Sequence, residues 1–401
     1  MKPKSDYKRF KVKGILIFSL ICFGNATTIP KDENVAVAVR FSNSLVPPLF
    51  QIFAGNYSNL VLSPFGLATT IAITMDCVHG KSFDEITKLF KLQSKPDRQQ
   101  LRTGFKTILN DFREGSINDE LAGSYNKAYL TTSKAFPMSF VEHLSDNYLV
   151  DVITNSSIAK NLNSVQILEL RTDSGIMSHW KDFQKLVVYT YLSYSASAPF
   201  YGAMNKTTNI PMIPLIGYFK AGYLSKLDCE GAELLFENKK ASLLLLMPTK
   251  IDELLVLQNK LFKENFFSVL DSLPQQETQI MIPQLSAVTN NLQLIPFLKL
   301  LGIVSVFSPK WDSKQKQDVF VQSIKQNAFF STSFSSLSSI GTFSSKYDAG
   351  SPSIKTEIRK KRESLMKITF NKPFMYFLIH RESGLILTTG HISNPKILPN
   401  Q

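Results

Sequence analysis

Cysteine is scarce in this chain of 401 residues, which contains only three. Cys77 and Cys229 are the two that remain once Cys22, part of an N-terminal segment considered below, is set aside. Two thiols are too few to frame a small disulfide-rich scaffold, so ordinary packing must stabilise the fold. Both lie in apolar segments, where buried unpaired cysteines are common. We therefore expect two free thiols, and a Cys77–Cys229 disulfide is the alternative.

Histidine is also scarce, and no histidine has the spacing of a metal site or of a nucleophile with its base. The triplet Gly80-Lys81-Ser82 resembles the end of a phosphate-binding loop, but Met75 occupies the place of that loop's first glycine. We therefore expect no catalysis of the protein's own, no metal and no cofactor. The five histidines are His79, His143, His179, His380 and His391.

Long apolar runs are absent beyond the N-terminus, where no segment reaches the eighteen or so apolar residues of a membrane span. Residues 1–26 hold six basic residues, then a short apolar run over 15–23, then Gly24-Asn25-Ala26. This order predicts a cleaved secretory signal peptide, a secreted mature protein starting near Thr27, and no membrane association. A membrane anchor is the alternative, but the apolar run is too short to span.

The mature chain is basic, because removing residues 1–26 lowers the formal net charge only from +13 to +8. Its basic runs lack interleaved aromatic residues, so nucleic acid is not an expected partner. Three Asn-X-Ser/Thr triplets would be open to glycosylation in a secreted protein. They begin at Asn56, Asn155 and Asn205.

Helical patterns dominate the first half of the chain, and strand patterns dominate the second. Apolar spacing predicts a helix over 34–54, broken by Pro47-Pro48, and a second helix that begins after Ser63-Pro64. Residues 27–401 are therefore predicted to form a single α+β domain. Further helices are expected at 82–90, 97–112, 137–148 and 292–301, and strands at 59–62, 122–130, 191–194, 234–236, 241–247, 279–282 and 374–379.

One segment, residues 331–369, is rich in serine and poor in apolar residues. It lies between two apolar segments that are expected to be buried strands. We predict a long exposed loop there, ending in the basic run Arg359-Lys360-Lys361-Arg362.

Many short motifs, in one order over nearly the whole mature chain, resemble the serpin family. The strongest resemblance is at the C-terminus, where Phe370-Asn371-Lys372-Pro373-Phe374 precedes two apolar strands joined by Arg381-Glu382-Ser383-Gly384. Further matching motifs are Asn59–Phe65, Asn126, Ile210–Ile213, Leu227–Cys229, Leu244–Pro248, Ile282–Leu285, Leu301–Ile303, Phe307-Ser308 and Gly390–Pro395.

The resemblance implies a monomeric secreted domain with three β-sheets, about nine helices and an exposed reactive-centre loop before Phe370. In inhibitory serpins a serine protease cleaves this loop and is trapped as an acyl-enzyme, because the loop then inserts as a new strand in the central sheet. The expected partner is an extracellular serine protease.

The family's spacing back from Phe370 places the reactive bond at Arg362-Glu363. Arg362 suits a trypsin-like protease, whose specificity pocket ends in a carboxylate. Arg359, Lys360 and Lys361 extend it into the multibasic pattern that furin-like convertases cut. The alternative reading is an ordinary solvated charge run.

The hinge that must enter the sheet departs from the pattern of inhibitory serpins. It reads Phe334, Ser335, Ser336, Leu337 and Ser338, without the usual acidic residues and alanine run, and Ile340 follows where alanine is usual. The whole loop is also longer than the family pattern. Slow insertion would let the protease escape, so the resemblance leaves two functions open, a poor inhibitor and a non-inhibitory carrier, binding or signalling protein.

Two other features of inhibitory serpins also differ in this sequence. Ala196 takes the place of a core tryptophan. In the buried polar cluster that helps the sheet open, Val188 replaces asparagine, Gln326 replaces histidine and Gly66 replaces serine, and Ser63 is retained.

A basic stripe is predicted on the helix at 97–112, where Arg98, Arg102 and Lys106 are four residues apart. In some serpins this region binds heparin-like polyanions. The alternative is a solvated helix face, since the opposite side of the helix carries the apolar residues that any surface helix needs.

Overall fold

The computed structural model describes residues 31–56, 58–92, 95–113, 125–159, 165–179, 197–203, 206–236, 241–308, 319–333 and 365–396. The predicted signal peptide and the predicted strand at 191–194 lie outside these ranges.

The N-terminal helix is broken, as the two prolines predicted. Helix α2 (Glu33–Asn43) begins after Asp32, whose carboxylate accepts a hydrogen bond from the Asn34 amide at 2.8 Å. Helix α3 (Val46–Phe53) follows, with Pro47 and Pro48 in its first turn. Residues 33–53 together have the length and hydropathy of a membrane span, but 78% of the apolar 18-residue window within that stretch is buried inside the protein, as in a core helix.

Helix α4 (Pro64–Cys77) lies at the centre of the fold and is buried on almost every face. Strand β1 (Asn59–Leu62) leads into it, and the Ser63 hydroxyl caps it by accepting a hydrogen bond from the Gly66 amide at 3.0 Å. Because a helix that is apolar on all sides has no solvated face, it must sit between other layers.

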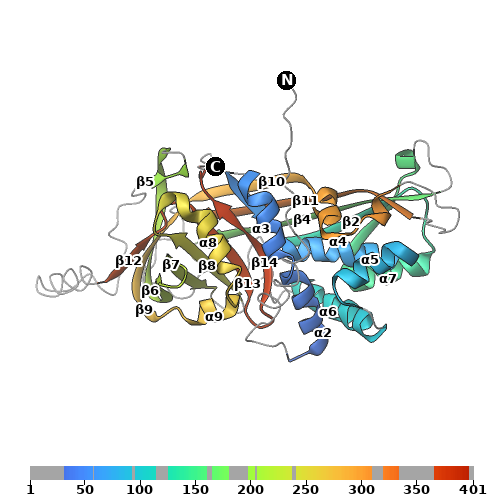
Figure 1. Ribbon diagram of the computed structural model, residues 1–401, viewed down its shortest axis with the longest axis horizontal. Coiled ribbons are helices and arrows are strands. Elements are labelled where there is room, and N and C mark those ends of the chain that lie inside the picture. The colour runs from blue at the N-terminus through green and yellow to red at the C-terminus, as the bar shows by residue number, and fades with distance from the viewer. Residues whose placement is uncertain are drawn as a thin grey trace, which may run out of the picture.

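The larger sheet has nine strands and forms one half of the molecule (Figure 1). Its order is β1-β14-β13-β8-β7-β6-β9-β12, with β5 paired to β6. Helices α8 (Leu254–Leu261) and α9 (Phe266–Asp271) lie beside it (Figure 1). Its other strands are β5 (Ser197–Tyr201), β6 (Thr207–Leu224), β7 (Cys229–Leu235), β8 (Ala241–Pro248), β9 (Gln275–Pro283), β12 (Met366–Thr369), β13 (Phe374–His380) and β14 (Leu385–Ile392).

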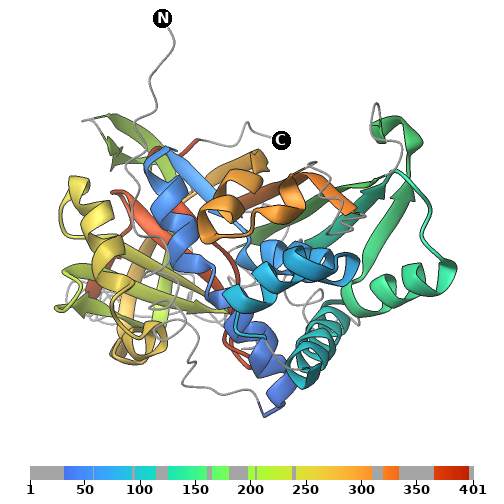
Figure 2. The same ribbon diagram turned by 45° about the vertical axis from the view of Figure 1, so that its right-hand side comes forward.

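The smaller sheet has five strands in the order β10-β11-β4-β2-β3. Helices α4, α5 (Gly80–Leu89), α6 (Lys95–Arg113) and α7 (Met138–Tyr148) lie on one side of it (Figures 1 and 2). Short helix α10 (Ile295–Leu301) follows β10 and ends at Gly302, whose φ is +105°. The strands are β2 (Tyr125–Thr132), β3 (Val150–Thr154), β4 (Gln166–His179), β10 (Leu285–Gln293) and β11 (Val319–Ser333).

Helix α6 packs directly against α2, and Gly104 makes this approach possible. A Cβ at Gly104 would lie 2.1 Å from the Asn34 carbonyl oxygen and 2.9 Å from the Ala38 Cβ. Because the first neighbour is backbone, no rotamer change could make room for a side chain. Gly104 therefore fixes where the basic residues of α6 lie.

The α+β fold is confirmed, with one difference in how the sheets are divided. Strand β6 is eighteen residues long, pairing with β5 at its start and with β9 and β7 further along. The described strands therefore form two sheets rather than the three expected, because one long strand joins two of them.

The limits of the predicted loop at 331–369 are wrong at both ends. Ser331 and Thr332 are buried in β11, which continues to Ser333, and β12 begins at Met366. The hydroxyl residues Ser331, Thr332 and Ser333 concealed the end of β11, and β12 is only four residues long. Residues 334–364 lie outside the described part of the chain.

Both described cysteines are free and buried, as predicted. Burial raises the pKa of the Cys77 thiol far above its usual range and raises that of Cys229 to about 12. The reactive thiolate is therefore nearly absent at pH 8. We expect a thiol reagent at pH 8 to leave both cysteines unmodified in the native mature protein and to modify both in urea, which a colorimetric thiol assay measures. Rapid modification of the native protein would contradict the burial of these groups.

Candidate functional site

The candidate site is the seam between strands β11 and β4 in the centre of the five-stranded sheet. The two strands run parallel and pair over almost their whole length, from Val319 opposite Gln166 to Ser333 opposite His179. One irregularity interrupts the register, between Val321 and Ser323. The seam is therefore closed, with no strand between β11 and β4.

The inner face of β11 is packed on the core. Ile324, Ala328 and Phe330 on this face are at most 2% exposed. Phe330 stacks on Tyr376 of β13, with ring centroids 4.0 Å apart and planes inclined by 13°. This stack joins the smaller sheet to the larger one.

The outer face of the seam is polar, and side chains bridge it. The Asn327 amide donates to the Asp173 carboxylate at 2.8 Å, and the Gln322 amide donates to Glu169 at 3.2 Å. Such exposed bridges add little to stability, so the inner face holds the seam closed.

A buried polar contact attaches the middle of β11 to the start of α4. The Gln326 side-chain oxygen accepts from the Ser63 amide at 2.9 Å, while its amide nitrogen donates to the Ser63 carbonyl at 2.8 Å. The Ser63 hydroxyl in turn donates to the Leu387 carbonyl of β14 at 3.1 Å. Both side chains are 1% exposed. We call this contact the Ser63–Gln326 clamp.

The clamp agrees with the resemblance to the serpin family, which placed Gln326 and Ser63 in one buried polar cluster. Gly66 also takes part, but only through its backbone amide on the Ser63 hydroxyl. Val188 and Ala196 lie outside the described residues. The sequence did not reveal that one glutamine side chain hydrogen-bonds to both backbone groups of Ser63, because the two residues are 263 positions apart.

The chain leaves the seam at Ser333 and is held again at β12, which belongs to the other sheet. Strand β12 pairs parallel with β9, and Ile368 is fully buried there. The Phe370 amide donates to the Met281 carbonyl at 2.9 Å. Residues 334–364 therefore connect two anchored strands in different sheets.

Several of the predicted site residues lie in this connection, outside the described part of the chain. Of the predicted glycosylation sites, Asn155 is exposed, and Asn56 lies in the short 3-10 helix Ala54–Asn56. The predicted site residues that lie outside the described ranges are Phe334, Ser335, Ser336, Leu337, Ser338, Arg359, Lys360, Lys361, Arg362, Glu363 and Asn205.

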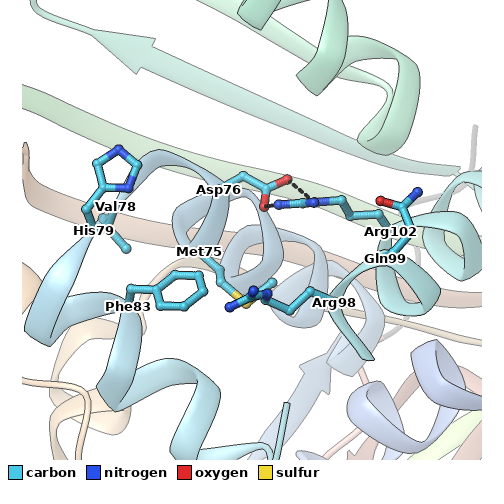
Figure 3. A pocket seen from close by; sticks show the side chains of 8 residues that line it. All are labelled: Met75, Asp76, Val78, His79, Phe83, Arg98, Gln99 and Arg102. Carbon is cyan, nitrogen blue, oxygen red and sulfur yellow. Dashed lines mark hydrogen bonds and ion pairs between the residues drawn. The ribbon is translucent and has the colours of Figure 1, made fainter. Parts of the chain in front are cut away.

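The basic stripe on α6 is less open than its spacing suggested. Arg102 forms a two-pronged ion pair with Asp76 of α4, with N–O distances of 2.6 to 3.0 Å (Figure 3). This hydrogen bond raises the pKa of Arg102. Arg98 lies over the Phe83 ring, 4.8 Å from its centroid. Lys106 alone of the three is exposed.

Asp76 organises this region, although sequence reasoning did not single it out. Its carboxylate is 1% exposed and also accepts a hydrogen bond from the Tyr148 hydroxyl at 2.9 Å, with His143 Nε2 at 3.3 Å. Its partners come from α6 and α7, which only the folded chain brings together.

The comparisons with known proteins agree with this fold. The sequence model of the family described as "Serpin (serine protease inhibitor)" matches residues 192–395. An uncharacterized serpin-like protein of Thermococcus kodakarensis is 22% identical over 388 residues, covering 91% of this chain and 88% of that protein.

Solved structures show the same fold at low sequence identity. The mouse protein-Z dependent protease inhibitor has a TM-score of 0.69 and 16% identity, with 91% of this chain and 100% of that chain covered. Native protease nexin-1 with heparin has a TM-score of 0.66 and 16% identity, with 90% and 99% covered.

The sequence alone predicts only that the protein has no catalysis of its own. The matched family is described as a serine protease inhibitor, and this description of the family replaces that expectation. The model match spans half of the sequence, and the fold agrees over nearly all of it. The chain therefore belongs to the serpin family.

Proposed function

We propose that this serpin is secreted and presents the bond Arg362-Glu363 to extracellular trypsin-like or furin-like serine proteases. After cleavage the acyl-enzyme is hydrolysed faster than the loop can insert, so that most encounters release the protease rather than trap it. The observation that carries this proposal is the closed β11–β4 seam, followed directly by a hinge with bulky residues.

Trapping would require the seam to open. A segment that follows β11 and folds back on it runs antiparallel to β11. It can become a strand between β11 and β4 only after their pairing breaks and the two strands move apart. The Ser63–Gln326 clamp and the Phe330–Tyr376 stack both oppose any movement of β11. The inserting segment therefore needs small side chains that fit between β11 and β4, and Leu337 and Ile340 are too bulky for this.

The same observations support a second function, a non-inhibitory serpin that acts as a carrier, binding or signalling protein. In that case the cleaved loop would never insert. The unfolding temperature after cleavage separates the two functions, because a new central strand adds a ladder of buried backbone hydrogen bonds.

Limited trypsin digestion of the native mature protein tests where the loop lies. We expect the first cut at Arg362 or a neighbouring basic residue, identified by mass spectrometry of the fragments. Arg362→Gln should move the first cut to the remaining basic residues, whereas Lys325→Gln, on β11, should leave it unchanged. First cuts elsewhere in the native protein would refute the loop assignment.

Incubation with trypsin and with a furin-like convertase then tests the outcome of cleavage. We expect mostly clean cleavage, with a minor band of protease adduct that survives SDS. Near-stoichiometric adduct would contradict slow insertion. Complete absence of adduct, with no rise in unfolding temperature on cleavage, would favour the non-inhibitory function.

A polyanion contact on α6 is proposed as an additional property, supported by Lys106 and by the heparin named with the related protease nexin-1. The alternative is a solvated helix face. We expect the double variant Arg98→Gln/Lys106→Gln to elute from heparin at lower salt than the unmodified protein. Arg102 is kept in this design, since its removal would leave buried Asp76 without its ion pair. Unchanged elution would remove the proposal.

A further inference from the structure

The surface between α4, α5 and α6 contains a cavity of about 590 Å³ that the proposed inhibitory function does not use. Its eight lining residues are Met75, Asp76, Val78, His79, Phe83, Arg98, Gln99 and Arg102 (Figure 3). The volume falls within the range of pockets that hold small organic molecules.

The lining of the cavity contains both apolar and cationic groups. Met75 and Val78 are buried at the end of α4, and the Phe83 ring stands beside them. The Arg98 guanidinium reaches across the cavity toward Met75 and Phe83 (Figure 3). A ligand with an apolar body and an anionic group could therefore contact Phe83 and Arg98 together.

The charges of the lining favour an anion. Arg102 and Asp76 neutralise each other in their ion pair. In the described part of the chain, no acidic side chain forms an ion pair with Arg98, so the positive charge of Arg98 is not neutralised. A guanidinium offers two parallel N–H groups that match the two oxygens of a carboxylate or sulfonate.

We propose that this cavity binds a small organic anion with an aromatic or branched aliphatic body. Arg98 pairs with the acid group, Gln99 offers an amide at the rim, and Phe83 contacts the body. Because the apolar contacts lie within the cavity, this site is distinct from a polyanion contact, which needs only exposed cations along α6.

Isothermal titration calorimetry with 2-naphthoate as the probe, and 2-naphthylmethanol as its neutral comparator, tests the proposal on the mature protein. We expect one site for the acid, with the alcohol binding at least tenfold more weakly. Arg98→Gln should weaken the binding of 2-naphthoate by about tenfold or more, because the two charge-assisted hydrogen bonds from the guanidinium are lost. Lys106→Gln, which removes the same charge two turns away on α6, should leave the affinity unchanged.

A second variant separates the cavity from simple charge attraction. Gln99→Trp should fill the rim and reduce 2-naphthoate binding while leaving the elution position on heparin unchanged. Thermal unfolding of each variant confirms that it is folded. The proposal is overturned if 2-naphthoate and 2-naphthylmethanol bind with equal affinity, or if Arg98→Gln and Lys106→Gln reduce the affinity for 2-naphthoate equally. It is also overturned if the Gln99→Trp variant binds 2-naphthoate as tightly as the unmodified protein.

Discussion

Gln326→Ala is expected to destabilise the protein by about 1–3 kcal/mol, because a buried backbone amide left without a partner costs about that much. The alanine would leave the Ser63 amide unsatisfied in a site where both residues are 1% exposed, while the Ser63 carbonyl would keep its hydrogen bond from the Leu67 amide at 3.1 Å. In an equilibrium constant this loss is roughly 5- to 150-fold. The midpoint of urea unfolding, followed by circular dichroism, measures it.

Gln322→Ala is the matched control. It removes the same side chain from the same strand, but Gln322 faces solvent and bridges only to Glu169. A surface change of this kind shifts stability by roughly 0.5 kcal/mol or less. Equal midpoints for Gln326→Ala and Gln322→Ala would mean that the clamp contributes nothing.

The double variant Leu337→Ala/Ile340→Ala is expected to raise the trapped fraction of trypsin by about tenfold. Forcing extra methylenes into a packed interior costs roughly 1–3 kcal/mol, and about 1.4 kcal/mol in a barrier is a factor of ten in rate. Insertion competes with deacylation of the protease, so a faster insertion step appears directly as more SDS-stable adduct. Densitometry of the adduct and of the cleaved serpin gives the ratio.

Ser336→Ala/Ser339→Ala provides the control for this variant. It adds two alanines to the same segment but removes no bulk, so the adduct fraction should stay close to that of the unmodified protein. If both double variants raise trapping equally, small size at these two positions is not the cause. If neither does, the barrier lies in opening the seam, and Gln326→Ala should raise trapping instead.

Local sequence patterns predicted many of the helices and strands well. Ser63-Pro64 marked the start of α4, Pro47-Pro48 the break between α2 and α3, and Gly302 the end of α10. Each of these signals acts within one turn of the chain, through a cap, a missing amide or a positive φ. They need no knowledge of tertiary structure.

The long strands of the seam were harder to predict. In β4 polar side chains alternate with apolar ones, and Thr172 and Ser174 face the core. Such a strand is stabilised by its neighbours rather than by its own composition. The same applies to Asp76 and Arg102, whose pairing depends on where α6 lies, and α6 is placed by its close approach to α2 at Gly104.

The tyrosine that stacks on Phe330 gives this protein a natural optical reporter. The Tyr376 hydroxyl is fully buried and, within the described residues, without a hydrogen-bond partner, so only ring contacts fix its orientation. If β11 slides by even one residue, the two rings separate. Near-ultraviolet circular dichroism should therefore follow the motion of this strand in real time without any attached dye, and Tyr376→Phe would show how much of the signal this ring contributes.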